Sequence, residues 1–160
     1  MLKQPSNIFL ISITFVISFI IISAIAIEYW LGHIPCELCL YERIPYYLSI
    51  PLIIKIIFFK KFEKIILLLL SLIFASSTIL AFYHFGIEQG FFSESFACEV
   101  RDISKALSKE QLAEQLKQNN VSCKEVNFRI LGFSLAAINA IFSLSLSVIF
   151  ARLFINYGKN

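Results

Sequence analysis

The stretch IFLISITFVISFIIISAIAI, residues 8–27, decides the fold because it carries no charged side chain over its whole length. A run of about twenty apolar residues is long enough to cross a hydrocarbon core of about 30 Å as an α-helix. The chain as a whole is also strongly apolar, since 58% of its 160 residues are hydrophobic and 16% are charged. The composition predicts an integral membrane protein and excludes a soluble domain of ordinary composition.

Three further runs extend this pattern. Residues 65–83 and 130–150 are long and uncharged, whereas residues 44–59 form a shorter run that contains two prolines and Lys55. We include the shorter run because Lys55 can extend its charged end toward the membrane surface and because membrane helices tolerate proline. The sequence therefore predicts an all-α membrane protein, a four-transmembrane-helix bundle that forms a single domain over residues 1–160.

The first run also has a second interpretation. Lys3, the apolar stretch and Ala24-Ile25-Ala26 fit a signal peptide with a small-residue cleavage site. We favour a retained helix because the run exceeds the about 7 to 15 apolar residues of a signal peptide. Either interpretation leaves the segment that follows on the same side of the membrane.

Four spans place both termini on one side and two connecting loops, about residues 28–43 and 84–129, on the other. The 14 Lys and Arg residues divide equally between the two sides. When only basic residues within about 15 positions of a span are counted, the side of the termini has the excess. The positive-inside rule then predicts cytoplasmic termini and external loops.

All four cysteines fall in these external loops. Cys36 and Cys39 form a CxxC motif at the entry to the second span, and Cys98 and Cys123 lie in the second loop. An even number of cysteines on the oxidising side of a membrane favours disulfide chemistry. The cysteines are therefore the candidate reactive groups.

A CxxC motif also occurs in zinc sites and in static disulfides. The second pair lacks the CxxC or HxxxH spacing of a zinc site, so we expect no metal. A static bridge between Cys36 and Cys39 would close too small a loop to stabilise the fold appreciably. A redox-active pair is the interpretation we favour, and the other two stay open.

The neighbours of the CxxC motif bear on its reactivity. A helix that begins near Cys36 would direct its first amides and its dipole at the sulfurs and favour a thiolate. Arg43 follows Cys39 by one helical turn, where its charge would favour the Cys39 thiolate and steady an anionic acceptor. Arg43 also fits a lipid-phosphate contact at the interface. Glu37 is expected to raise the pKa of both thiols.

Aromatic residues and a histidine complete the candidate site. The aromatic residues fit an interfacial belt, or a wall for a flat ring-shaped ligand. They are Tyr29, Trp30, Tyr41, Tyr46 and Tyr47. His84, at the external end of the third span, fits either a group that polarises a ligand carbonyl or an ordinary interfacial histidine.

The second loop contains one predicted element of its own. Ser108 and Gln111 have the spacing of a capping box ahead of an apolar helical face. They predict a short amphipathic helix, which would lie on the bilayer or belong to a small solvated cap.

At this point the string PCELCLYER, residues 35–43, together with Cys98 and Cys123, resembles the DsbB family, the disulfide-forming quinone reductases of the bacterial inner membrane. The similarity extends over essentially the whole chain in span order, loop sizes and cysteine placement. It implies a protein-dithiol:quinone oxidoreductase with both termini in the cytoplasm and its cysteines facing the periplasm.

The resemblance also implies roles for single residues. Cys98 would form the mixed disulfide with the partner and Cys123 would be its disulfide mate. Cys123 would then exchange with Cys36, while Cys39 would face the quinone beside Arg43.

His84 would take the place of a histidine near the quinone. The implied cofactor is ubiquinone or menaquinone. The implied partners are a DsbA-like periplasmic thiol oxidase, the quinone pool and the lipid bilayer, with no nucleic acid.

Two other functions use the same cysteines. In one, the chain is a non-catalytic membrane scaffold or metal-binding protein. In the other, it is a membrane reductant of external thiols, with electrons running in the reverse direction.

Overall fold

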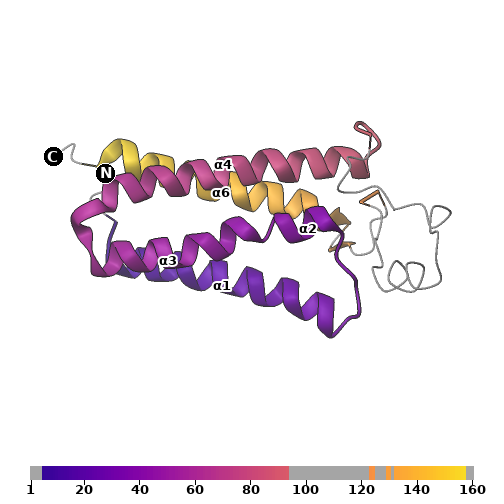
Figure 1. Cartoon of the computed structure of the whole chain (residues 1–160), viewed down its shortest axis with the longest axis horizontal. Helices are drawn as coiled ribbons and strands as arrows, with labels where there is room; N and C mark the ends of the chain where they lie inside the picture. Colours follow the sequence, from indigo (N-terminus) through magenta and orange to yellow (C-terminus); the bar gives the residue numbers. More distant parts are fainter. Residues whose placement is uncertain (1–4, 94–122, 125–128, 131, 158–160) are drawn as a thin grey trace, which may run out of the picture.

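The computed structural model describes residues 5–93, 123–124, 129–130 and 132–157. The helices are α1 (Asn7–Tyr29), α2 (Glu37–Tyr41), α3 (Ile44–Phe58), the 3-10 helix η1 (Lys60–Phe62), α4 (Glu63–Glu88) and α6 (Leu135–Asn156). Figure 1 shows an elongated bundle in which the start of α1 and the end of α6 lie at one end and α2 at the other. The described part is thus mostly helical, as predicted.

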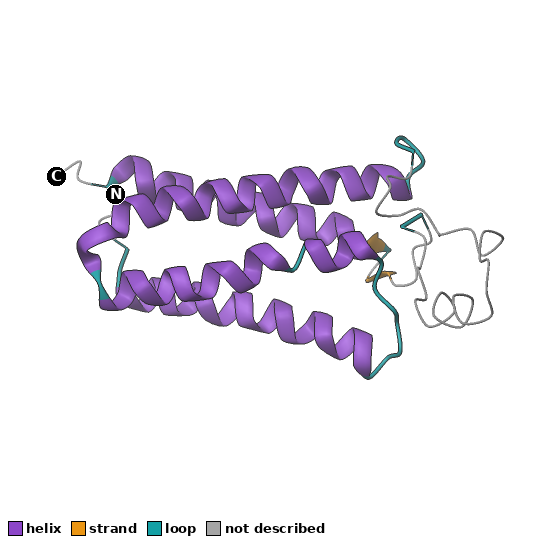
Figure 2. Ribbon diagram, viewed as in Figure 1, coloured by secondary structure: helices purple, strands orange, loops and turns teal. Residues whose placement is uncertain are grey.

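Three helices, α1, α4 and α6, are long and apolar enough to cross a membrane. They correspond to the predicted spans at residues 8–27, 65–83 and 130–150. Helix α3 has 15 residues, which gives about 22 Å of length, less than a hydrocarbon core of about 30 Å. A short break separates it from α2 (Figure 2), so its passage across the membrane stays a prediction.

The ends of two spans differ from the prediction. Helix α6 begins at Leu135, because residues 129–134 form a small antiparallel hairpin of strands β1 (Arg129–Ile130) and β2 (Phe133–Ser134). Gly132 adopts a φ of 88° in its turn, a conformation that glycine allows without steric cost. The Ser134 side chain then caps the helix by accepting a hydrogen bond from the Ala137 amide. The third predicted span also ends later than expected, because α4 continues to Glu88. His84 therefore lies inside a helix.

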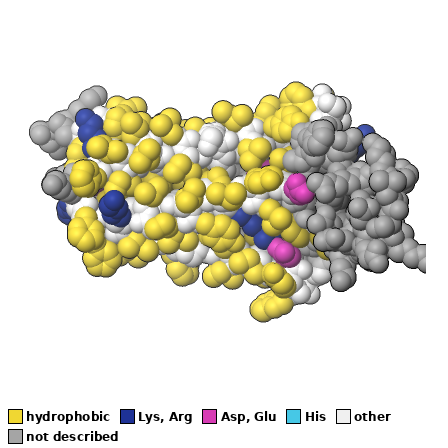
Figure 3. All heavy atoms as spheres, in the orientation of Figure 1, with side chains coloured by type: hydrophobic (Ala, Val, Ile, Leu, Met, Phe, Trp, Pro, Cys, Tyr) yellow, Lys and Arg dark blue, Asp and Glu magenta, His cyan; other side chains and the backbone are white. Residues whose placement is uncertain are grey.

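The sides of the bundle are covered by apolar side chains. Large hydrophobic residues such as Ile8, Phe15 and Ile79 are mostly exposed. Figure 3 shows hydrophobic side chains along the visible face, with Lys or Arg side chains at the left end and others right of the centre beside Asp or Glu. Such an exposed apolar surface is expected where lipid tails surround a protein.

The core between the helices positions the site. Phe74 of α4 is fully buried, where its ring packs edge-on against Tyr46 and parallel to Phe150. Helices α4 and α6 also approach closely through Ser71 and Ser147, each of which donates to the other's backbone carbonyl. Small residues of this kind allow helix backbones to pack tightly in membranes. The predicted amphipathic helix around residues 108–116 lies outside the described residues.

Candidate functional site

Cys36 and Cys39 meet at the first turn of α2. Cys36 is the N-cap of this helix, and its Sγ accepts a hydrogen bond from the Cys39 amide at 3.4 Å. The two Sγ atoms are 2.9 Å apart and both cysteines are free thiols. A helix does begin beside Cys36, with its amide directed at that sulfur as the sequence predicted.

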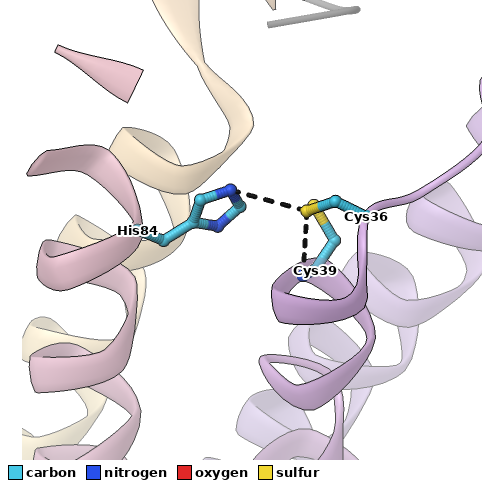
Figure 4. Close-up of side chains that lie close together, drawn as sticks. All are labelled: Cys36, Cys39 and His84. Atoms are coloured by element: carbon cyan, nitrogen blue, oxygen red, sulfur yellow. Dashed lines mark hydrogen bonds between the residues drawn. The ribbon is translucent and has the colours of Figure 1, made fainter. Parts of the chain in front are cut away.

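His84 approaches the same sulfur from α4. Its Nε2 lies 3.6 Å from Cys36 Sγ (Figure 4), and the side chain is buried. On the other side of the ring, Nδ1 lies 2.7 Å from Oε1 of Glu42. A thiol, an imidazole and a carboxylate are therefore arranged in series, an order that positions and polarises the imidazole next to the sulfur.

Hydrogen bonds continue from Glu42 into the bundle. Asn139 of α6 donates to Glu42 Oε2 at 2.6 Å, and its Oδ1 accepts from the Tyr46 hydroxyl. Tyr46 and Ser77 each form a hydrogen bond with Ser143, at 3.0 and 3.1 Å. Each of these buried polar groups thus has a partner, as buried polar groups generally require.

The hydrogen bonds give the two thiols opposite acid–base character, and they correct the expectation that the Cys39 thiolate is favoured. The hydrogen bond with Cys39 lowers the pKa of the Cys36 thiol to about 4, and His84 contributes while burial opposes the shift. The hydrogen bond with Cys36 and then burial raise the pKa of Cys39. At neutral pH the pair therefore shares one proton, which stays on Cys39.

The structure corrects two expectations about the charged residues near the CxxC motif. Arg43 does not lie on one continuous helix with Cys39, because α2 ends at Tyr41 and α3 begins at Ile44. Its Nη1 instead donates to Glu28 Oε2 at 2.6 Å, so much of its charge is directed at a carboxylate. Glu37 is exposed and is not among the causes of either thiol pKa shift.

Cys123 joins the first pair in the interior. It is disulfide-bonded, and it lies in one buried cluster with Cys36, Leu38 and Ile87. Its predicted mate, Cys98, lies outside the described residues. Three of the four candidate cysteines are therefore brought together by the fold.

A cavity of about 390 Å³ opens beside these cysteines. Its polar end includes Cys36, Cys39, Cys123, Arg43 and His84. Its wall is apolar and comes largely from α1 and α6, with Phe19, Ile20, Ile138 and Phe142 among the lining residues. This size and mixture of surfaces is typical of a site for a small organic ligand.

The aromatic cluster contributes less to this cavity than one interpretation of the sequence expected. Tyr46 lines the cavity, whereas Tyr29, Trp30, Tyr41 and Tyr47 are exposed on the outside. The exposed four fit the alternative of an interfacial aromatic belt. Phenylalanines from α1 and α6 supply aromatic rings for the wall instead.

Comparison with known proteins agrees with the site. The family profile described as disulfide bond formation protein DsbB matches residues 6–153. The chain belongs to the DsbB family. Uncharacterized protein RP370 of Rickettsia prowazekii (strain Madrid E) is 31% identical over 135 residues, which cover 83% of this chain and 78% of that protein. No solved structure matches the chain.

DsbB-family membership assigns the chain to the machinery of disulfide bond formation, as a redox enzyme of the inner membrane. Sequence reasoning missed Glu42 and Asn139 as parts of the site. The one available signal was an amide within the otherwise apolar run at residues 130–150, because polar groups inside a membrane helix usually face a partner.

Proposed function

We propose that this DsbB-family chain oxidises a periplasmic dithiol protein of the DsbA type and passes two electrons and two protons to a membrane quinone. The observation that carries the proposal is the meeting of three cysteines at one cavity. The free thiols of Cys36 and Cys39 and the disulfide-bonded Cys123 all line it. An apolar wall next to reactive thiols suits a hydrophobic two-electron acceptor.

The first exchanges oxidise the partner. In each exchange a thiolate attacks one sulfur of a disulfide, a new S–S bond forms, and the other sulfur leaves as a thiolate. A partner thiolate attacks Cys98 of the Cys98–Cys123 disulfide and forms a mixed disulfide. The partner's second thiol then displaces Cys98, so the partner leaves oxidised while Cys98 and Cys123 hold its two electrons.

The next exchanges move the electrons inward. Cys123 attacks Cys36 of the Cys36–Cys39 disulfide, which forms a Cys36–Cys123 bond and frees Cys39 as a thiolate. Cys98 then attacks Cys123, which restores the outer disulfide and releases Cys36. The end state has a reduced inner pair and a restored outer disulfide; the free thiols of Cys36 and Cys39 and the disulfide-bonded Cys123 support this order of exchanges.

The inner pair is suited to deliver both electrons. A bound quinone supplies a two-electron, two-proton acceptor, and Cys39, Arg43 and the apolar wall of the cavity would hold it. Cys36 is the thiolate of the pair because of its low pKa, and Cys39 retains one proton. The Nε2 atom of His84, fixed through Nδ1 by Glu42, lies within reach of Cys36 to hold a second proton.

The test mixes the purified full-length protein, a reduced DsbA-type partner and a ubiquinone or menaquinone analogue, while quinone absorbance is followed. Cys39→Ser is expected to abolish quinone reduction. Cys98→Ser is expected to abolish partner oxidation and to leave a chemically reduced inner pair able to reduce quinone. Glu37→Gln, at an exposed position of the same helix, serves as the control.

Full activity in either cysteine variant would contradict the proposed electron route. The reverse direction is distinguished in the same apparatus, with quinol and oxidised partner as the starting materials. A non-catalytic scaffold would change neither the quinone absorbance nor the thiol content of the partner.

A further inference from the structure

Three metal-binding atoms converge at the inner pair. The Sγ atoms of Cys36 and Cys39 and the Nε2 of His84 lie within 4.8 Å of one another. His84 is 48 positions from Cys36 along the chain, so this cluster is created by the packing of α4 beside α2. Thiolate and imidazole are the ligands that zinc prefers.

The distance from His84 to Cys36 fits a tetrahedral site. Zn–S bonds of about 2.3 Å and Zn–N bonds of about 2.0–2.1 Å put a sulfur and a nitrogen about 3.5–3.6 Å apart at a tetrahedral angle. The separation of Cys36 Sγ and His84 Nε2 is 3.6 Å. The two sulfurs are closer, at 2.9 Å, so they must move apart when a cation enters.

The histidine is already held in the orientation of a metal ligand. Its Nδ1 is bonded to Glu42 Oε1 at 2.7 Å, and Glu42 is itself held by Asn139. This leaves Nε2 directed at the sulfurs. Zinc-bound histidines commonly have a carboxylate on the far ring nitrogen, where it fixes the ring and increases its basicity.

Glu88 supplies an independent observation. Its side chain is 6% exposed, and its Oε1 is 3.9 Å from His84 Nε2. Its Oε2 is buried and has no hydrogen-bond partner within the described part of the chain. Glu88 is not one of the three clustered ligands, but a carboxylate at this distance from His84 Nε2 would favour a positive charge bound at that nitrogen.

We propose that the reduced Cys36 and Cys39 thiols and His84 form a binding site for a thiophilic divalent cation such as zinc. Binding releases the proton retained on Cys39 and the proton held on His84 Nε2, and it forms two sulfur bonds and one nitrogen bond to the cation, with no change of oxidation state. Oxidation of the pair to a disulfide removes both thiolates and abolishes the site. The site shares Cys36, Cys39 and His84 with the proposed function, but cation binding needs neither quinone nor partner.

The test uses the full-length chain with Cys98→Ala and Cys123→Ala, so that Cys36 and Cys39 are the remaining thiols. The reduced protein is titrated with zinc chloride against a chromogenic chelator and then with cobalt(II) chloride. We expect one zinc per chain and a cobalt spectrum with thiolate charge-transfer bands. After diamide oxidation the same protein should bind neither metal.

A matched pair of histidine variants identifies the nitrogen ligand. His84→Asn should weaken zinc binding by at least about tenfold. His33→Asn should leave the affinity unchanged, because His33 lines the same cavity but is not a member of the cluster. No zinc in the reduced protein, equal zinc after oxidation, or equal affinity in His84→Asn would each overturn the proposal.

The comparison of reduced and oxidised protein is made within one polypeptide, so any effect of Cys98→Ala and Cys123→Ala on folding is present in both states. The quinone assay, run with a chelator present, tests the proposed function separately. Failure of zinc binding therefore leaves that assay interpretable, and failure of the quinone assay leaves the zinc titration interpretable.

Discussion

Cys36 accepts a hydrogen bond from the Cys39 amide, shares one with the Cys39 sulfur and lies beside His84. Cys39 faces the negative charge that these contacts stabilise on Cys36. One CxxC motif thus contains a thiolate and a thiol at neutral pH. In the proposed cycle the difference lasts only while both residues are reduced. Once Cys36 joins a disulfide with Cys123, the thiolate that raises the pKa of Cys39 is gone.

The pH profile of Cys36 alkylation tests this difference. Because the pKa of Cys36 is lowered to about 4, its thiolate is populated above that pH and lost as the pH falls through it. The rate of reaction with iodoacetamide, followed by mass spectrometry in the presence of a chelator, should be flat across neutral pH and decline in acid. Cys39→Ala removes the largest cause of the shift and should raise the midpoint by at least about one pH unit. An unshifted profile would contradict the assignment.

Substitution of Glu42 provides a second test of the contacts around Cys36. Glu42→Gln removes the charge that orients His84 toward Cys36, so kcat/KM for quinone reduction should fall about tenfold. The matched control is Glu37→Gln, since Glu37 is exposed five positions earlier. If both variants behave alike, the contact between Glu42 and His84 has no role in turnover.

The residues of the site were predictable to different degrees. The CxxC motif and its position beside a helix start are local features, so the sequence indicates them. Glu42 and His84 meet across 42 positions, and Glu42 and Asn139 across 97. No local pattern encodes such contacts, which depend on how α4 and α6 pack beside α2.

Among the helices, α4 carries the largest share of the core. Phe74 lies between rings from α3 and α6, while Phe82 on the same helix is 62% exposed. Substitutions at these two positions therefore distinguish the contribution of packing between helices from that of contact with lipid.

We expect Phe74→Ala to lower the free energy of unfolding by about 3 kcal/mol, because a buried ring is replaced by a cavity. Phe82→Ala should change it by less than about 0.5 kcal/mol. Unfolding by sodium dodecyl sulfate in mixed micelles, followed by circular dichroism, measures both. Equal losses in the two variants would show that Phe74 has no special part in packing.

Helix ends were harder to predict than helix existence. Apolar runs predict the three long helices because the hydropathy of a span is a local property. The run at residues 130–150 gave no sign that its first residues form a hairpin, which depends on the positive φ of Gly132 and on the Ser134 cap. Likewise, His84 and Glu88 extend α4 beyond its apolar part because both side chains are buried among neighbours.

For the molecule as a whole, the reactive cysteines and the ends of the chain are separated by the length of the bundle (Figure 1). The turn between α3 and α4, which contains Lys60, lies at the same end as the termini. Glu37 lies at the other end, in α2. These two exposed positions therefore report on both orientation and the passage of α3 across the membrane.

Cysteine labelling tests the predicted orientation. In a variant whose four native cysteines are replaced by serine, Glu37→Cys should react with a membrane-impermeant maleimide added to spheroplasts. Lys60→Cys should react only after lysis, since the positive-inside rule puts that turn in the cytoplasm. Labelling of both positions from outside would show that α3 does not cross the membrane.

Asn139 forms hydrogen bonds with both Glu42 and Tyr46. These two bonds constrain which substitutions related proteins can accept at the three positions. Loss of the amide would leave a buried carboxylate oxygen and a buried hydroxyl each short of one partner, and such groups are costly to bury. A substitution at position 139 therefore favours compensating substitutions at positions 42 and 46. Across a set of relatives, these three positions should covary even though they come from opposite halves of the chain.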